Sequence, residues 1–420
     1  FLDYYTGIQI EKSTNEKARK FWFWLSIVVN LGFLGVFKYF NFFSDSFAQL
    51  LTSVGFKASP ILLDVILPVG ISFYTFHGLS YVIDIYYKRI KAEYNFVDYS
   101  LFVSYFPLLV AGPIERATHL LPQVKVQRSF DLEKAKEGLA QFVWGLVKKV
   151  VIADTCATYA NAVFDNYPAM NSLSLMLGAI YFAFQIYGDF SGYSDMALGM
   201  SKLFGIDLLK NFNYPYFSRD IAEFWRRWHI SLSSWFRDYL YIPLGGSQGG
   251  MWFKIRNTFI IFLVSGFWHG ANWTYVVWGL LNAIYFLPLL VLQKNRNNTG
   301  PVVVNFDWKG LQTVVNILIT FLLSTIAWVF FRAKSITDAV LYLKQMIING
   351  DFSSQYLSNE RYNYEILLLI GVFVVVEWNN RNRVEPLSGR YSLLKFGLAI
   401  AAIMALGTFS DYKEFIYFQF

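Results

Sequence analysis

Charged residues are scarce in this sequence of 420 residues. Asp, Glu, Lys and Arg make up 15% of the chain, whereas about a quarter is usual in soluble globular proteins. Hydrophobic residues make up 55%, aromatic residues make up 20%, and the mean hydropathy is +0.37. This composition excludes an ordinary soluble protein and predicts an all-α integral membrane protein that crosses the bilayer several times.

Cysteine and several catalytic signatures are also missing. Cys156 is the single cysteine, which excludes an internal disulfide and a cysteine-rich metal site. The four histidines show no HExxH spacing, no GxSxG elbow is present, and PLGGSQGG (243–250) lacks the GK[ST] ending of a P-loop. We therefore expect no metal and no permanently bound cofactor, and we interpret the glycine-rich stretch as a turn.

The net charge of +7 fits cytoplasmic loops that face anionic membrane lipid, and no basic element for nucleic acid is evident. No polar stretch is long enough to fold separately, so we predict a single membrane domain over residues 1–420. The chain opens on Phe1 without an initiator methionine, and we expect an N-terminal piece to be missing.

Apolar runs predict where the chain crosses the membrane. The predicted crossings are 21–43, 60–87, 131–165, 172–205, 311–331, 364–378 and 391–409, with two helices in 257–292. Residues 99–113 are too short for an easy crossing, 336–349 are amphipathic, and 350–363 are polar and expected to be exposed. Within 172–205, Asp189 and Asp195 either line a cavity or pin two helices together.

The run 257–292 contains His269 and has nearly twice the length of about 20 residues that one crossing needs. It must tilt, bend back or break. Gly266 and Gly270 bracket His269 as helix terminators, and Asn272 is a suitable N-cap for a second helix. His269 is thus predicted at a gap deep in the membrane, where an ionisable group is a functional candidate. The alternative is a histidine that only joins packed helices.

A polar segment, residues 206–250, precedes that run. Apolar residues recur at helical spacing from Ile221 to Tyr239, which predicts one amphipathic helix in the cytoplasmic interface. Asp220 followed by Glu223 resembles a capping box and marks its start. His229 lies at the edge of the apolar stripe, so its side chain can point into the protein.

Two long strings in these segments resemble the signatures of the membrane-bound O-acyltransferase family. They are NFNYPYFSRDIAEFWRRWHISLSSWFRDYLYIPLGG (211–246) and SGFWHGANWTYVVWG (265–279). More narrowly, they are similar to its bacterial alginate O-acetyltransferase branch. FQIYGDFSGYSDMALG (184–199), VFFRA (329–333) and the ending FIYFQF are similar to that branch too. The resemblance therefore covers most of the chain, with a motif core at about 184–292.

The resemblance implies a helical bundle with a funnel from each face, the invariant histidine of the family at His269, and its second polar position at His229. It also implies acetyl-CoA as donor, a saccharide hydroxyl as acceptor, and a place in the bacterial cytoplasmic membrane. An extracytoplasmic serine-esterase-like acetyltransferase is the implied partner if the acetyl group is relayed. Members of the family begin with further membrane segments, which are absent here.

Joined to the residues, the resemblance leads to a mechanistic hypothesis. Burial disfavours the charged imidazolium, and a neutral imidazole is what a general base requires, so His269 is assigned as base and His229 orients a substrate. The basic residues Arg226, Arg227 and Arg237, with neighbouring Lys254, are predicted to attract the anionic nucleotide of the donor. Trp268, Asn272 and Asp189 are the other predicted substrate-binding residues.

Three other interpretations remain open. A related D-alanyl transferase acting on teichoic acid shares the paired histidines, a transporter could also use a broken helix, and a scaffold could recruit a soluble transferase. The sequence has no internal repeat of the kind that transporter halves show.

Overall fold

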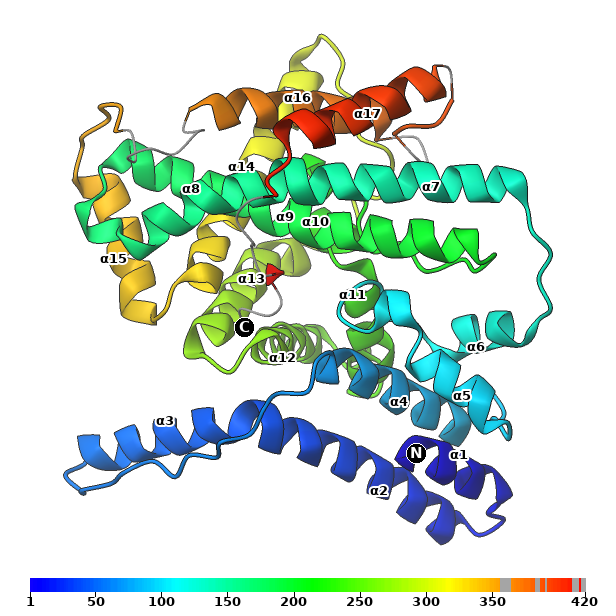
Figure 1. Cartoon of the computed structure of the whole chain (residues 1–420). Coiled ribbons are helices and arrows are strands. Elements are labelled where there is room, and N and C mark those ends of the chain that lie inside the picture. The colour runs from blue at the N-terminus through cyan, green and yellow to red at the C-terminus, as the bar shows by residue number, and fades with distance from the viewer. Residues whose placement is uncertain (356–363, 382–385, 390, 410–414, 417–420) are drawn as a thin grey trace. The chain divides into compact units, whose positions relative to one another are not determined.

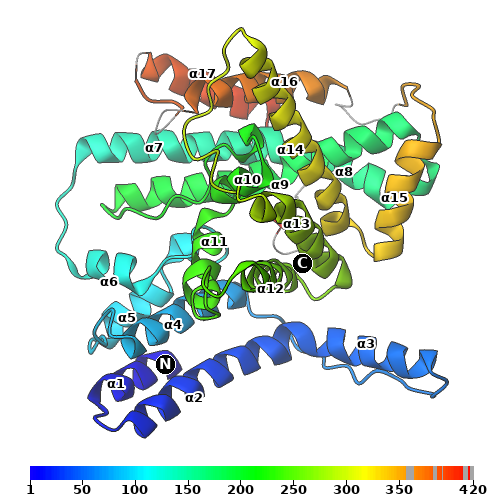
Figure 2. The ribbon, with the colours of Figure 1, turned by 180° about the vertical axis from the view of Figure 1, so that it is seen from behind.

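The computed structural model describes residues 1–355, 364–381, 386–389, 391–409 and 415–416 (Figures 1 and 2). Helices dominate and no strand occurs within these ranges, which confirms the all-α class. The chain divides into two compact units. The first comprises residues 1–129, 206–209 and 270–272, and the second comprises residues 130–205, 210–269 and 273–420.

The first unit contains six α-helices in its described residues. They are α1 (Leu2–Lys12), α2 (Glu16–Leu34), α3 (Phe40–Ser53), α4 (Ile71–Tyr86), α5 (Phe96–Val103) and α6 (Ala117–Lys125). A π-helical turn, η1 (Gly35–Tyr39), joins α2 to α3, and a 3-10 turn, η2 (Phe106–Leu108), follows α5. The short helices at 96–108 agree with the expectation that residues 99–113 do not cross the membrane.

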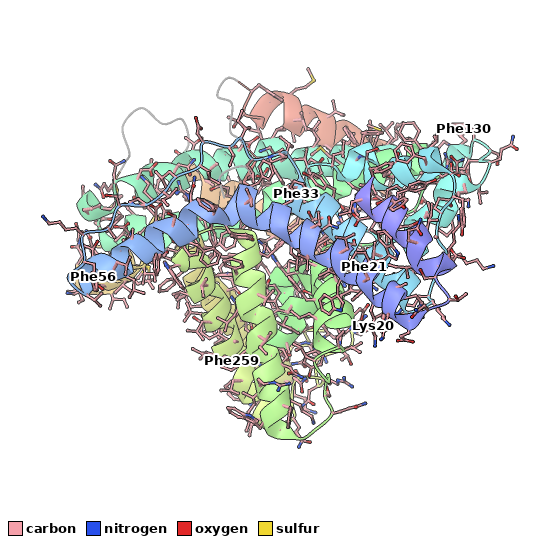
Figure 3. The ribbon with its side chains drawn as sticks, turned by 90° about the horizontal axis from the view of Figure 1, so that it is seen from below. Lys20, Phe21, Phe33, Phe56, Phe130 and Phe259 are labelled. Carbon is pink, nitrogen blue, oxygen red and sulfur yellow. The ribbon has the colours of Figure 1, made fainter. Side chains whose placement is uncertain are left out.

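The first membrane-spanning helix is longer than the sequence predicts. α2, η1 and α3 form one helical stretch, Glu16–Ser53, that is long and apolar enough to cross a bilayer. Phe21 and Phe33 expose 59% and 57% of their surface along α2 (Figure 3), as expected for a helix that lipid surrounds. The predicted end at residue 43 is wrong because no glycine or proline occurs between residue 43 and Gly55, where φ is +92°.

The predicted helix over 60–87 is wrong in its first half. Residues 57–68 have no regular structure, and α4 begins only at Ile71. Pro60 and Pro68 lack a backbone donor, and Gly70 takes φ +74° just before the helix. His77 is buried in α4, with its ring 5.7 Å from that of Phe102, as expected for a structural histidine.

The second unit contains eleven α-helices in its described residues. They are α7 (Leu132–Leu146), α8 (Asp154–Asp165), α9 (Ser172–Leu203), α10 (Ile221–Arg227), α11 (Ile230–Phe236), α12 (Met251–His269), α13 (Trp273–Val291), α14 (Trp308–Arg332), α15 (Ile336–Ile348), α16 (Glu365–Asn380) and α17 (Ser392–Leu406). Short 3-10 turns lie at η4 (Tyr167–Ala169) and η5 (Pro215–Phe217), and π-helical turns lie at η3 (Val147–Ala153) and η6 (Arg237–Tyr241).

Three helices of the second unit, α9, α13 and α14, meet the length and hydropathy that a membrane crossing requires. With the first-unit helix they make this a multi-pass membrane protein. α16 and α17 coincide with the predicted crossings at 364–378 and 391–409, and α17 is shorter than predicted. Residues 351–354 are exposed, whereas 356–363 and most of the FIYFQF ending lie outside the described residues.

Buried ion pairs fasten α9 to its neighbours. Lys149 Nζ lies 2.7 Å from Asp189 Oδ1, and Lys148 Nζ lies 3.0 Å from Asp195 Oδ2 and 3.2 Å from Glu377 Oε1. Asp189 also accepts a hydrogen bond of 2.7 Å from the backbone N–H of Ile416. Of the two roles that the sequence left open for these aspartates, the contacts favour joining helices.

Candidate functional site

The two helices that flank His269 form a close antiparallel hairpin. α12 ends at His269 and α13 starts at Trp273, so the run 257–292 breaks where the sequence predicts. A Cβ atom on Gly266 would overlap the Tyr275 carbonyl oxygen. The prediction that Gly266 ends a helix is therefore wrong: it lies inside α12 and permits the approach of α13.

His229 also lies at a helix break, and here the prediction of one continuous helix over 221–239 is wrong. α10 ends at Arg227 and α11 starts at Ile230, with His229 between them at φ +44° and ψ +54°. Few non-glycine residues adopt this left-handed conformation, and it is often found at functional sites. Asp220 caps α10 as predicted, because its side chain accepts a 2.7 Å hydrogen bond from the Glu223 N–H.

The two breaks bring the histidines together inside the second unit. The ring centroids of His229 and His269 are 6.4 Å apart, and the side chains are 1% and 6% exposed. Aromatic rings enclose His269: its centroid lies 5.1 Å from that of Trp278 and 5.3 Å from that of Phe331. Burial, and then the neighbouring His269, hold the pKa of His229 well below its ordinary value, so this imidazole is neutral at pH 7.

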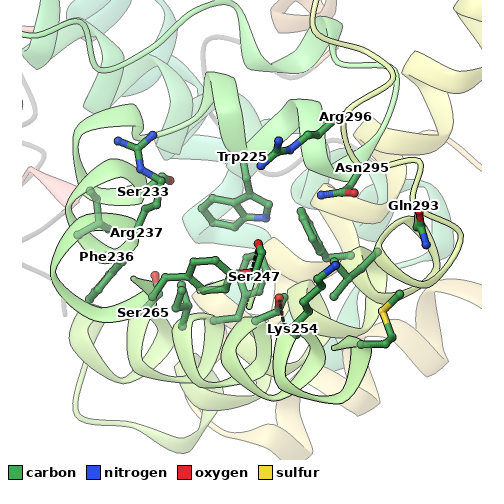
Figure 4. Close-up of a pocket in the computed structure, with 18 residues that line it drawn as sticks. Trp225, Ser233, Phe236, Arg237, Ser247, Lys254, Ser265, Gln293, Asn295 and Arg296 are labelled. Atoms are coloured by element: carbon green, nitrogen blue, oxygen red, sulfur yellow. Dashed lines mark hydrogen bonds between the residues drawn. The ribbon is translucent and has the colours of Figure 1, made fainter. Parts of the chain in front are cut away.

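A pocket of about 570 Å³ runs along one face of α12 (Figure 4). Its α12 side includes Lys254, Thr258, Ile261 and Ser265, and Ser265 lies one helical turn before His269. Arg237, Lys254 and Arg296 supply positive charge, whereas the rest of the wall is largely aromatic and aliphatic. Such a pocket suits a ligand with an anionic part and an apolar or neutral part.

The histidines themselves do not line this pocket. Its nearest boundary toward them is aromatic: Trp225 lines the pocket, and Trp278 packs against both Trp225, at 5.6 Å, and His269. Figure 4 shows Trp225 facing into the pocket, with Lys254 and Ser265 across from it. Along α12, the pocket therefore reaches Ser265, one helical turn before His269.

The predicted substrate-binding residues separate into two groups. Arg237 lines the pocket, where its guanidinium pairs with Asp238 at 2.7 Å. Arg226 and Arg227 are absent from the pocket lining. Arg226 donates to the carbonyl oxygens of Asn295 and Asn298, which shapes the loop that forms part of the wall.

Arg227 instead belongs to a buried ion-pair cluster. It pairs with Glu223 at 2.8 Å, and Arg219 pairs with the same carboxylate at 2.9 Å. Burial raises the pKa of Glu223, but the hydrogen bonds and charges of these arginines outweigh it and leave that pKa below its ordinary value. Arg227 thus holds α10 in place rather than reaching the pocket.

The remaining predicted site residues are spread out. Trp268 lies beside the pair, with its ring 6.2 Å from that of His229. Asp189 is ion-paired with Lys149, away from the pocket lining. Asn272 falls in the link 270–272, which is grouped with the first unit.

Sequence reasoning did not identify Asn211, which is 1% exposed and bonded to His229. It also did not identify Arg296 and Asn295 in the pocket wall. The available signal for Asn211 was its position as the polar first residue of the NFNYPY string, which belongs to the family signature. No sequence pattern distinguishes Arg296 from other loop arginines.

The fold and site define a polytopic membrane protein with a buried histidine pair next to a pocket with a basic wall. Comparison with known sequences supplies the family: the chain belongs to the membrane-bound O-acyltransferase family, whose model matches residues 86–331. That match includes both histidines and confirms the resemblance on which the site assignment rests.

Relatives with assigned names are similar over most of this chain. A probable alginate O-acetylase of Pseudomonas aeruginosa is 43% identical over 85% of the chain and 66% of its own length. A peptidoglycan O-acetyltransferase of Helicobacter pylori is 36% identical over 86% of the chain and 71% of its own length. A teichoic acid D-alanyltransferase of Bacillus subtilis is more distant: it is 28% identical over 63% of the chain and 69% of its own length. The chain spans about two thirds of the length of the first of these relatives.

Proposed function

We propose that this protein is a membrane O-acetyltransferase that moves an acetyl group from acetyl-CoA to a hydroxyl of an extracytoplasmic polysaccharide. The observation that carries the proposal is the pair of buried histidines, 6.4 Å apart, in a chain of the O-acyltransferase family. Names of relatives at 43% and 36% identity, which refer to alginate and to peptidoglycan O-acetylation, support a polysaccharide acceptor.

The reaction needs one base and a place for each substrate. The acceptor oxygen attacks the thioester carbonyl carbon as an imidazole takes the hydroxyl proton. The C–O bond forms, the C–S bond breaks, and the proton passes to the departing CoA thiolate. The sequence favours His269 as the base, and a base so positioned typically contributes a factor of about 10² to 10⁴ in rate.

The donor is proposed to bind in the pocket beside α12. Its phosphates would lie near Lys254, Arg237 and Arg296, because charge-assisted hydrogen bonds from such groups are the usual means of holding phosphate. The pantetheine arm would extend along α12 toward Ser265.

The location and the partner follow from the same proposal. Acetyl-CoA is made in the cytosol, so the pocket opens to the cytoplasmic face of the bacterial inner membrane. The acetyl group then goes to the polymer directly, or it passes through an extracytoplasmic serine-esterase-like acetyltransferase.

A comparison of two histidine variants tests the proposal. Membranes that contain wild type, His269→Gln or His119→Gln are incubated with acetyl-labelled acetyl-CoA, and labelled polymer is measured. His269→Gln should lower transfer about 100-fold or more at equal protein level. His119 is the matched control because it lies in α6 and pairs with Glu115.

Two outcomes contradict the proposal. Full transfer by His269→Gln would remove this imidazole from the chemistry and favour a scaffold. Wild-type membranes that incorporate no label from acetyl-CoA, but do incorporate D-alanine from its carrier protein, would move the chain to the D-alanyl branch.

A further inference from the structure

Asn211 contacts His229 through its side chain and the next residue, Ile230, through its backbone. Asn211 Oδ1 lies 3.1 Å from His229 Nδ1, 2.8 Å from Ser231 Oγ and 3.3 Å from the Ser231 backbone nitrogen. The backbone oxygen of Asn211 accepts a 2.9 Å hydrogen bond from the Ile230 N–H. Asn211 therefore holds His229 and the two residues that follow it.

These contacts fix which end of the Asn211 amide faces the histidine. A backbone N–H can only donate, so the Asn211 atom that meets the Ser231 nitrogen must be the amide oxygen. The amide nitrogen is then turned the other way, where it donates to Ser194 Oγ at 3.2 Å. The amide orientation follows from its partners on both sides.

The amide oxygen in turn fixes the tautomer of His229. An acceptor at 3.1 Å from Nδ1 requires the proton to be on Nδ1, which leaves the lone pair of the neutral ring on Nε2. His229 Nε2 is buried and has no hydrogen-bond partner among the described residues. A buried acceptor without a partner is destabilising, so a substrate hydrogen there would relieve that cost.

The ring cannot easily turn away from this arrangement. Phe190 packs edge-on against His229, with the centroids 4.6 Å apart, and the ring of Phe212 is stacked 6.4 Å away. The backbone of His229 is held in the left-handed region by the Asn211 contacts on its neighbours.

We propose that Asn211 is a positioning residue that fixes His229 Nε2 as a hydrogen-bond acceptor. His229 then binds the substrate hydroxyl that receives the acetyl group. The inference rests on the proposed acetyl transfer. A thioester carbonyl and the oxyanion that forms from it can only accept hydrogen bonds, so this tautomer cannot hold them. A hydroxyl can donate its hydrogen to Nε2, which places and orients its oxygen. Because a hydroxyl has only one hydrogen, that hydrogen must turn from His229 Nε2 to His269, the proposed base, as the oxygen attacks.

The experiment uses three variants of the full chain in native membranes, which keep the natural acceptor in place. Asn211→Asp retains an oxygen that accepts from Nδ1 and adds a negative charge that favours the imidazolium. Asn211→Leu removes the acceptor. Asn213→Asp is the control, since it adds the same charge two residues away, where the side chain accepts from Lys210 Nζ at 3.0 Å.

The measurements are kcat against pH and the KM for acetyl-CoA. Asn211→Asp should stay active at high pH and move the acid limb of kcat upward by about one pH unit or more, because an adjacent carboxylate raises the pKa of His229. Asn213→Asp should keep the wild-type acid limb. Asn211→Leu should lower kcat about tenfold or more with the KM for acetyl-CoA unchanged.

Other results would overturn the inference. It fails if the acid limb of Asn211→Asp coincides with that of wild type, or if Asn211→Leu raises the KM for acetyl-CoA and keeps kcat. If Asn211→Leu does not accumulate in the membrane, the pH profile of Asn211→Asp decides alone. Wild-type membranes without any acetyl transfer would instead refute the proposed function.

Discussion

Individual arginines in this protein differ in role according to their immediate partners. Arg219 and Arg227 share the buried carboxylate of Glu223, which holds both guanidinium groups and compensates part of their charge. Arg226 donates to two loop carbonyl oxygens. Lys254 and Arg296, by contrast, border the pocket. Charge available to an anionic ligand is therefore found at the pocket and not in the FWRRWH string itself.

This difference predicts which substitutions weaken donor binding. Lys254→Gln combined with Arg296→Gln should raise the KM for acetyl-CoA about tenfold, equivalent to about 1.4 kcal/mol, with kcat little changed. The effect should shrink as salt is raised, because the lost interaction is electrostatic. Steady-state kinetics at two ionic strengths measures both effects.

Lys309→Gln is the matched control, since Lys309 is exposed and lies outside the pocket. Its KM should equal that of wild type. An equal KM for the double variant and the control would exclude this pocket as the donor site.

At the residue scale, the sequence identified His269 because an ionisable group in a long apolar run is unusual. It could not identify Asn211, whose importance depends on a contact with a residue 18 positions away along the chain. The pairing of Arg227 with Glu223 follows the i,i+4 spacing of the predicted helix, and the sequence assigned Arg227 to the nucleotide instead because its charge was considered without this partner.

Among the elements, the α12–α13 hairpin positions His269. A Cβ on Gly266 would overlap the Tyr275 carbonyl oxygen, and one on Gly279 would overlap the Phe262 carbonyl oxygen. Both obstacles are backbone atoms, which cannot move aside as a flexible side chain can. The two helices can approach this closely only because both positions are glycine.

Gly266→Ala should therefore separate α12 from α13 and displace His269. We expect at least a tenfold loss of acetyl transfer and a lower apparent unfolding temperature in detergent. Overpacking of this kind typically lowers the free energy of unfolding by about 1–3 kcal/mol. Activity in membranes and a thermal unfolding scan measure the two effects.

Gly371→Ala serves as the control within another apolar helix, because a Cβ at Gly371 in α16 would meet no atom within 4 Å. It should leave transfer unchanged and should not lower the unfolding temperature, since alanine favours a helix by about 1 kcal/mol over glycine. Identical behaviour of the two variants would mean that the hairpin does not depend on Gly266.

At the element scale, one helix break was predictable and the other was not. The break after His269 contains Gly270, and the sequence run was too long for a single crossing. The break at His229 interrupts an apolar stripe that continues on both sides. No glycine or proline marks it, because tertiary contacts from Asn211 hold the left-handed residue.

On the scale of the whole second unit, long helices and buried ion pairs hold the site in a membrane environment. Lys148 and Lys149 extend from the π-helical turn η3 to carboxylates of α9 and α16. A buried lysine or carboxylate left alone in such a setting would cost several kcal/mol. Hydropathy predicted the crossings at α9, α13 and α14, but it could not predict these pairings, because they depend on how the helices pack.

α14 gives the second unit a direction across the membrane. Its 25 residues rise about 1.5 Å each, which exceeds the roughly 30 Å of a bilayer core. The loop before it carries the pocket residues Asn295 and Arg296, and Lys334 follows its other end. If the pocket takes a cytosolic donor, residue 297 must face the cytosol and residue 334 the outside.

Cysteine labelling tests this orientation with little background, because the single native cysteine, Cys156, is buried. In intact cells an impermeant maleimide should label Lys334→Cys and not Asn297→Cys. Permeabilised cells should show label on both, and wild type should stay unlabelled. The opposite pattern would place the basic pocket wall on the side that acetyl-CoA does not reach, and the pocket would then have to serve a different anionic ligand.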